Sequence, residues 1–126
     1  MNSIRFQVQL TTDRIVQYAH SINSPLQRIE GAVIAPSTMP VTFWKVEDVL
    51  WLNKEETWVH GAQQFYYHAP LTAGMNLACE LSLVKVEHKN GRQGVLNLYT
   101  HSLVCYHQGN TVAVAETILI GIGDRK

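Results

Sequence analysis

Histidine is the residue type in this chain best suited to proton transfer near neutral pH, and the sequence holds six of them. His60 is the strongest candidate for a catalytic acid or base, because it opens a His60–Gly61 step ahead of an aromatic stretch. The alternative is that His60 forms a hydrogen bond at the start of a strand and sets a bend with Gly61. No histidine pair has the tight spacing of a metal motif such as HExxH, so we expect no metal site.

A second kind of chemistry could come from backbone N–H groups at the start of a helix. The sequence Pro-Ser-Thr-Met-Pro at residues 36–40 is typical of a helix N-terminus. An apolar stripe at helical spacing follows, formed by Met39, Phe43, Val46 and Leu50. We therefore predict a long helix here. Its free N–H groups near Ser37, Thr38 and Met39 could polarise a substrate carbonyl, although ordinary capping is the alternative.

The remaining pattern predicts one short helix and a run of strands. Residues 4–10 alternate like a strand, residues 12–21 have helical spacing behind a Thr-Thr-Asp cap, and residues 25–35 are predicted to form a loop. Alternation then predicts strands at residues 57–68, 75–87, 94–107 and 111–121. On the third of these, Leu96, Leu98, Val104 and Tyr106 share a face. One long helix beside an antiparallel sheet is an α+β fold, and we expect residues 1–126 to form a single domain.

Composition excludes several classes of function. The net charge is zero with histidine neutral, so nucleic acid is not an expected partner. No apolar run reaches about 18 residues, so we expect no membrane span. The N-terminus has no signal-peptide layout, and we predict a cytoplasmic protein. Phosphate-binding glycine motifs and the G-x-S-x-G nucleophile motif are absent from the sequence.

Cys79 and Cys105 are the two cysteines, and each lies within an apolar strand pattern. We interpret them as small buried hydrophobic residues in a reducing compartment. A disulfide and a catalytic thiol are the alternatives.

Several segments together resemble the N-terminal-type domain of the MaoC-like dehydratases, which are hot-dog proteins acting on acyl thioesters. They are Tyr18-Ala19 in the first helix, Ala35-Pro36-Ser37-Thr38, Thr42-Phe43, His60-Gly61-Ala62-Gln63-Gln64-Phe65, His68-Ala69-Pro70-Leu71 and Ala73-Gly74. The resemblance covers most of the chain, roughly residues 6–120. It implies a hot-dog fold, in which an antiparallel sheet wraps around one long central helix.

In the MaoC-like hydratases, a Gly-Asp-x-Asn-Pro-x-His type motif after the first helix carries the catalytic acid and base. The matching segment here runs from Ile22 to Gln27 and is one residue shorter. Asn23 stands in place of the aspartate and Gln27 in place of the histidine. Amides can orient a water molecule but cannot exchange its proton, whereas carboxylate and imidazole groups can. The resemblance therefore implies a degenerate acid/base pair.

The resemblance implies a subunit of an (R)-specific enoyl-thioester hydratase or 3-hydroxyacyl-thioester dehydratase. The substrate would bring its own coenzyme A or acyl-carrier-protein pantetheine, so we expect no separate cofactor. We expect a homodimer, or a heterodimer with a catalytic hot-dog subunit, and substrate contacts from Ser37, Thr38, Met39 and Gly61. Two alternatives stay open. One is a hot-dog thioesterase using Glu47 or Asp48, and the other is a non-catalytic acyl-thioester binding protein.

Overall fold

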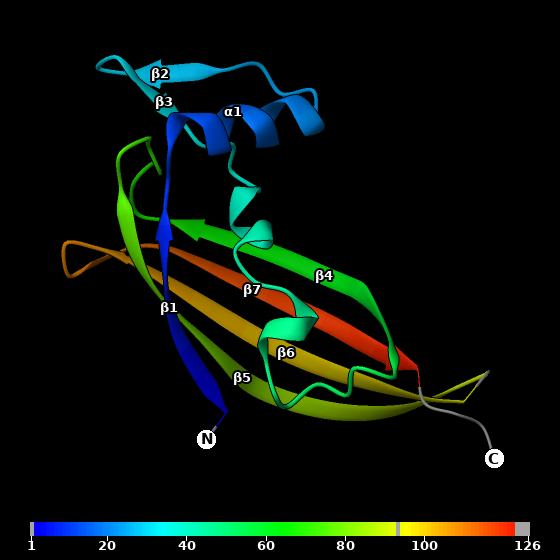
Figure 1. Cartoon of the computed structure of the whole chain (residues 1–126). Helices are drawn as coiled ribbons and strands as arrows, with labels where there is room; N and C mark the ends of the chain where they lie inside the picture. Colours follow the sequence, from blue (N-terminus) through cyan, green and yellow to red (C-terminus); the bar gives the residue numbers. More distant parts are fainter. Residues whose placement is uncertain (1, 93, 123–126) are drawn as a thin grey trace.

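The computed structural model of the chain describes residues 2–92 and 94–122. Its main body is a five-stranded antiparallel sheet with strand order β1-β5-β6-β7-β4. The strands are β1 (Ser3–Gln9), β4 (Thr57–Tyr67), β5 (Asn76–Gly91), β6 (Gly94–His107) and β7 (Asn110–Ile122). The helix α1 (Thr12–Ser21) and a small hairpin of β2 (Gln27–Ile29) and β3 (Ala32–Ile34) lie together beyond one end of this sheet (Figure 1). This arrangement confirms the predicted α+β class.

Helix α1 begins and ends where the sequence predicts. Thr11 is its N-cap, and the side chain of Thr11 accepts a hydrogen bond from the Arg14 N–H at 3.1 Å. The helix buries Ile15 and Ala19 against the core. This short helix is the only α-helix among the residues that the structure describes.

The long helix predicted over residues 39–50 is absent, and this prediction was wrong. Two short 3₁₀ turns, η1 (Met39–Thr42) and η2 (Val46–Asp48), take its place. Lys45 and Val49 are both extended, so the chain leaves the helical conformation twice. Of the predicted apolar stripe, Met39 and Phe43 are buried but Leu50 is 94% exposed.

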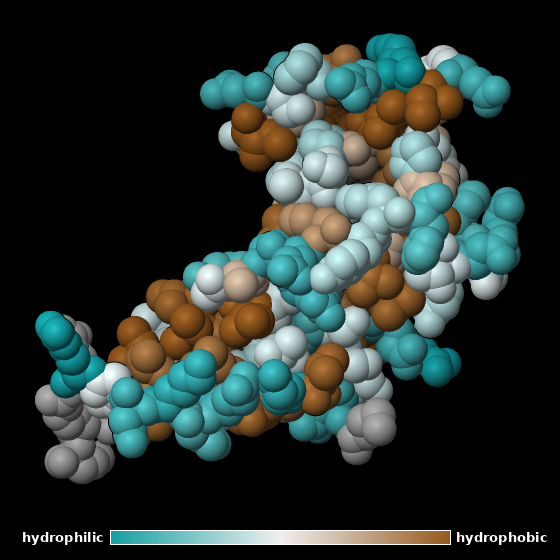
Figure 2. All heavy atoms as spheres, turned by 180° about the vertical axis from the view of Figure 1, so that it is seen from behind, coloured by the Kyte–Doolittle hydropathy of each residue, from teal (hydrophilic) through white to brown (hydrophobic). Residues whose placement is uncertain are grey.

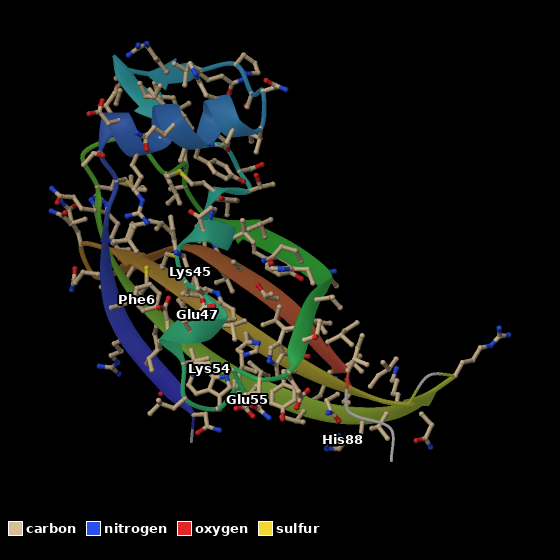
Figure 3. The ribbon with its side chains drawn as sticks, turned by 45° about the vertical axis from the view of Figure 1, so that its right-hand side comes forward. Phe6, Lys45, Glu47, Lys54, Glu55 and His88 are labelled. Carbon is tan, nitrogen blue, oxygen red and sulfur yellow. The ribbon has the colours of Figure 1, made fainter. Side chains whose placement is uncertain are left out.

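Local chemistry accounts for this break. The Thr42 hydroxyl donates to the Met39 carbonyl at 2.9 Å, and the Asp48 carboxylate accepts the Lys45 N–H at 2.8 Å. Such bonds from side chains to the local backbone compete with a continuous helix. Pro40 lies in the first turn, where its missing N–H would have no intrahelical partner, so Pro40 does not cause the break. Residues 35–56, called the connecting segment below, therefore cross in front of the sheet as an irregular chain that carries Lys45 and Glu47 (Figure 3).

The β2–β3 hairpin replaces the loop predicted over residues 25–35. Its two-residue turn is Glu30–Gly31, with φ of 49° and 84°. Positive φ at both turn positions suits the right-handed twist of a hairpin, and glycine adopts this conformation without strain.

The core lies between the inward face of the sheet, α1 and the connecting segment. Its buried members include Leu77, Cys79 and Leu81 of β5, Leu103 and Cys105 of β6, and Ala113, Ala115 and Leu119 of β7. The inward face of β6 thus uses the odd-numbered positions, while the apolar even-numbered set is only partly buried. Seen from behind, apolar and polar surface lie side by side over the sheet (Figure 2).

Candidate functional site

A groove of about 400 Å³ lies where the end of α1, the β2–β3 hairpin and the start of the connecting segment meet. We call it the α1 groove. Its lining residues are Ile22, Ser24, Pro25, Gln27, Ile34, Ala35, Pro36, Ser37 and Thr38. Three of the predicted site residues, Gln27, Ser37 and Thr38, are therefore brought together, although Gln27 is ten residues before Ser37 in the chain.

Two tyrosines hold the Ser37–Thr38 wall of the α1 groove. The Tyr18 hydroxyl of α1 and the Thr38 hydroxyl are 2.7 Å apart. The Tyr67 hydroxyl, at the end of β4, donates to the Ser37 carbonyl at 2.5 Å. Burial raises the pKa of Tyr67, so its hydroxyl stays protonated and remains a donor throughout the physiological range. The wall is thus fastened both to the helix and to the main sheet.

Asn23 has a structural role that the sequence motif did not suggest. Its φ is 55°, in the left-handed region, directly after the C-cap residue Ile22. The Asn23 N–H donates to the His20 carbonyl at 3.2 Å, and the Ser24 N–H donates to the Ala19 carbonyl at 2.9 Å. These two bonds form a Schellman motif, in which asparagine is the common substitute for glycine. Asn23 itself is not among the lining residues of the groove, whereas its neighbours Ile22 and Ser24 are.

The backbone at Met39 does not provide the predicted carbonyl-polarising site. The Met39 N–H already donates to the Pro36 carbonyl at 3.0 Å, and the Val41 N–H donates to the Thr38 carbonyl at 3.1 Å. The Met39 side chain is 1% exposed and belongs to the core. Because η1 is a single 3₁₀ turn, it lacks the row of free N–H groups that starts an α-helix.

His60 lies outside the α1 groove. It lines a cavity of about 120 Å³ under the connecting segment, together with Val41, Trp44, Lys45, Val46, Trp58, Thr117 and Leu119. Tyr67 contacts Ser37 at the groove, and His60 is seven residues earlier in the same strand. An extended strand rises about 3.3 Å per residue, so the backbones of His60 and Tyr67 are on the order of 20 Å apart, and the His60 cavity shares no lining residue with the α1 groove. The structure therefore does not bring His60 together with Gln27.

Gly61 marks a β-bulge between His60 and Ala62. A Cβ atom at this position would lie 2.7 Å from Cδ1 of Ile120, so the close approach of β7 favours glycine. This geometry agrees with the interpretation in which the His60–Gly61 step bends the strand. Gly61 is not a lining residue of the α1 groove or of the His60 cavity.

His101 is a buried polar residue whose environment the sequence pattern did not reveal. It is 0% exposed on the inward face of β6. Its Nε2 accepts the Trp51 indole N–H at 2.9 Å, so its other ring nitrogen, Nδ1, carries the proton and donates to the Tyr99 carbonyl at 3.1 Å. Burial lowers the pKa of His101, which keeps the ring neutral. Both ring nitrogens have partners, so His101 is a structural rather than a reactive group.

Residues 2–92 and 94–122, which the structure describes, hold neither a metal-binding cluster nor a membrane-spanning helix. Within these ranges no three histidine, cysteine or acidic side chains gather in a group that could hold a metal ion. No helix within them is long and apolar enough to cross a membrane.

A family model described as FAS1-like, dehydratase domain region, matches residues 2–115 of the chain. The chain belongs to the FAS1-like dehydratase domain family. This match confirms the family to which the sequence segments pointed. No curated protein matches the chain.

Solved structures share the fold of this FAS1-like dehydratase domain. One is a C-terminally truncated HadBC (3R-hydroxyacyl-ACP dehydratase) complex from Mycobacterium tuberculosis, with 18% identity, a TM-score of 0.75 and 94% of each chain covered. Another is a hot-dog-like protein from Thermanaerovibrio acidaminovorans, with 11% identity, a TM-score of 0.64 and coverage of 96% of this chain and 81% of that one.

A third is an (R)-hydratase from A. caviae involved in PHA biosynthesis, with 10% identity and a TM-score of 0.67. The match covers 93% of this chain and 92% of the hydratase chain. These likenesses confirm the hot-dog fold. In the family member described here, however, the connecting segment with its two 3₁₀ turns replaces the predicted long helix.

Proposed function

We propose that this chain is the non-catalytic half of an acyl-thioester hydratase or dehydratase. It would bind the thioester in the α1 groove and rely on a second hot-dog subunit for proton transfer. The main support is that none of the nine residues lining the groove carries a titratable side chain. Hydration of an enoyl thioester requires one group that takes a proton and another that gives one.

The groove nevertheless suits a pantetheine thioester. Gln27, Ser37 and Thr38 supply amide and hydroxyl groups, while Ile22, Ile34 and Ala35 supply apolar surface. Small-molecule sites commonly combine an apolar wall with a few fixed polar groups. The two tyrosine hydrogen bonds hold the polar wall in place before ligand arrives, which lowers the entropy lost on binding.

The partner is proposed to dock along β4. This strand pairs only with β7 in the part of the chain that the structure describes, so its other edge presents unpaired backbone groups. Val59 and Tyr66 of β4 are 43% and 49% exposed. The HadBC structure is itself a complex of dehydratase subunits, which supports a hot-dog partner for this chain. We propose a cytoplasmic location for the chain. The structure does not identify the partner or the carrier of the acyl group, which is coenzyme A or an acyl carrier protein.

The thioesterase alternative has less support. Asp48 accepts the Lys45 N–H and is committed to the local turn, and neither Asp48 nor Glu47 lines the α1 groove. Loss of acyl-CoA hydrolysis in Glu47→Gln, from a wild-type chain that hydrolyses it, would favour this alternative. A purely binding protein differs from the main proposal only in lacking a catalytic partner.

Calorimetric titration with crotonyl-CoA tests the proposed site. Gln27→Leu is expected to weaken binding about 3- to 10-fold, since it removes a polar group worth roughly 1 kcal/mol. Gln9→Leu is the matched control, because Gln9 is exposed on β1 and lines none of the grooves. Unchanged affinity in Gln27→Leu, combined with lost binding in His60→Ala, would move the site to the His60 cavity.

A further inference from the structure

The two cysteines of this chain lie directly opposite each other on neighbouring strands. Cys79 of β5 and Cys105 of β6 are register partners in the antiparallel sheet. Their Sγ atoms are 3.8 Å apart. The two thiols are 26 residues apart in the sequence and come together only through the fold.

We propose that Cys79 and Cys105 form a site of reversible oxidation, closing to an intramolecular disulfide with hydrogen peroxide as the oxidant. Directly opposed residues of an antiparallel pair have Cα atoms about 4.5 or 5.5 Å apart, and both values lie within the range that a disulfide spans. The sulfurs need to approach from 3.8 Å to about 2.05 Å. Rotation of the two side chains can supply most of this movement without separating the strands.

Cys79 is the thiol that reacts first. The hydrogen-bonding contact between the two thiols lowers the pKa of Cys79, burial acts against this, and the positive charge of Arg14 on α1 lowers it further. The pKa of Cys105 is raised by that same hydrogen bond and by burial. The two thiols are therefore unequal, and Cys79 is the nucleophile.

A small oxidant would reach Cys79 before Cys105, because Cys79 is on β5, next to the edge strand β1, whereas Cys105 is on the more central β6. Both cysteines are at most 2% exposed on the inward face of the sheet, whereas the groove of about 540 Å³ that Cys79 borders is lined mostly by outward-facing residues. The other lining residues are Arg5, Phe6, Gln7, Ala78, Glu80 and Tyr106. Phe6 lies opposite Cys79 on the seven-residue edge strand β1, which is the strand that would move to admit the oxidant.

The chemistry balances in two steps. The Cys79 thiolate attacks one peroxide oxygen, so an S–O bond forms, the O–O bond breaks, and the leaving hydroxide becomes water with the proton lost by Cys79. The Cys105 sulfur then attacks the Cys79 sulfenic acid, so an S–S bond forms, the S–O bond breaks, and the Cys105 proton leaves with the hydroxide as a second water. Two thiols are oxidised by two electrons and one peroxide is reduced to two waters.

Treatment of the full-length chain with hydrogen peroxide tests this proposal. Intact mass and thiol titration after unfolding should show loss of both thiols in a monomeric product, independent of protein concentration, with recovery of both after dithiothreitol. Peptide mapping should join the peptides that contain Cys79 and Cys105. Two thiols that persist under peroxide, or a disulfide that forms only between chains, would overturn the proposal.

Two single variants test the order of the steps, with circular dichroism verifying that each is folded. Cys105→Ala should accumulate a sulfenic acid at residue 79 that dimedone traps. Cys79→Ala should oxidise at Cys105 at least about tenfold more slowly. Equal rates in the two variants would contradict the assignment of Cys79 as the nucleophile. The wild-type mass measurement decides whether the disulfide forms, even if a variant is unstable.

Discussion

Trp51 of the connecting segment donates its indole N–H to Nε2 of His101 on the inward face of β6, at 2.9 Å. The rings of these two residues also stack, with centroids 5.9 Å apart. The ring centroid of Trp44 lies 4.9 Å from that of His101. One buried imidazole thus holds two tryptophans of a segment that has no regular secondary structure beyond two short turns. The contacts of Trp44 and Trp51 with His101 thus anchor the connecting segment to the sheet.

Stability is expected to fall on mild acidification because of His101. The folded-state pKa of His101 lies below its unfolded value of about 6.5, since burial disfavours the charged ring. The unfolded chain therefore binds the proton more readily. The stability that His101 contributes is fully present above about pH 6.5 and is lost as the pH falls toward the folded-state pKa. Urea unfolding between pH 7.5 and 5 measures this loss.

The same titration in His101→Gln should show a shallower pH dependence, since the titrating ring is gone. His88→Gln is the control, because His88 is an exposed histidine of the same sheet. An identical pH dependence of unfolding in wild type and His101→Gln would show that the Trp51–His101 contact does not titrate in this range.

Trp51→Phe should destabilise the fold by about 1–3 kcal/mol, because it leaves a buried imidazole nitrogen without a donor. Trp58→Phe is the matched comparison, with the same change in ring size. The Trp58 indole N–H donates to the Asn53 carbonyl at 2.7 Å near solvent, where water can replace it. Chemical denaturation should therefore rank Trp51→Phe as the more damaging change, and the reverse ranking would count against the role given to His101.

Gly121→Ala should destabilise the end of the sheet by about 1–3 kcal/mol through overpacking. A Cβ atom on Gly121 would meet the Glu56 carboxylate and would lie 2.7 Å from the rigid Trp58 ring. At Gly61 the nearest atoms are those of the flexible Ile120 side chain, so Gly61→Ala should cost less. Thermal unfolding of the two variants compares them directly, and equal loss would mean that the ring can move aside.

Asn23 is predicted to tolerate glycine but not a β-branched residue. Its φ of 55° suits glycine and asparagine, whereas valine there should cost on the order of 1–2 kcal/mol. Equilibrium unfolding of Asn23→Gly and Asn23→Val measures the difference. If both variants have wild-type stability, the turn after α1 does not depend on this conformation.

Association through β4 predicts a dimer at micromolar concentration. Tyr66→Lys should weaken it at least about tenfold, since it places a charge on an exposed aromatic position of the docking strand. Val84→Lys is the control, because Val84 is 61% exposed on β5, away from that edge. Sedimentation equilibrium distinguishes them. A wild-type chain that is monodisperse as a monomer would remove the support for a homodimer.

Alternation and capping were sufficient to predict the sheet and α1 from the sequence. The strands around Phe6, Leu81 and Leu103 occur where a period of two predicts them, and Thr11 caps α1. The prediction from the stripe beginning at Met39 was wrong, since apolar spacing alone does not reveal that the Thr42 and Asp48 side chains bond to the local backbone. The spacing of apolar residues along one segment does not show which part of the fold packs against that segment.

The candidate site was predicted in part. Gln27, Ser37 and Thr38 line one groove, and their part in substrate binding stays a prediction. His60 could not be excluded from that site by sequence, because its distance from Ser37 depends on the length and direction of β4. The burial of His101 was not predicted, because the apolar even-numbered residues of β6 indicated the opposite face, and no sequence feature indicates its bond to Trp51.

Hydration of crotonyl-CoA by the purified, folded chain tests the central claim most directly, followed as loss of the enoyl-thioester absorbance. The α1 groove has no titratable lining residue, so the chain alone should bind the thioester without turning it over. Turnover should appear only when a catalytic hot-dog subunit is added. Turnover by the chain alone that disappears in His60→Ala would contradict this account and would make His60 the acid/base of a self-sufficient hydratase.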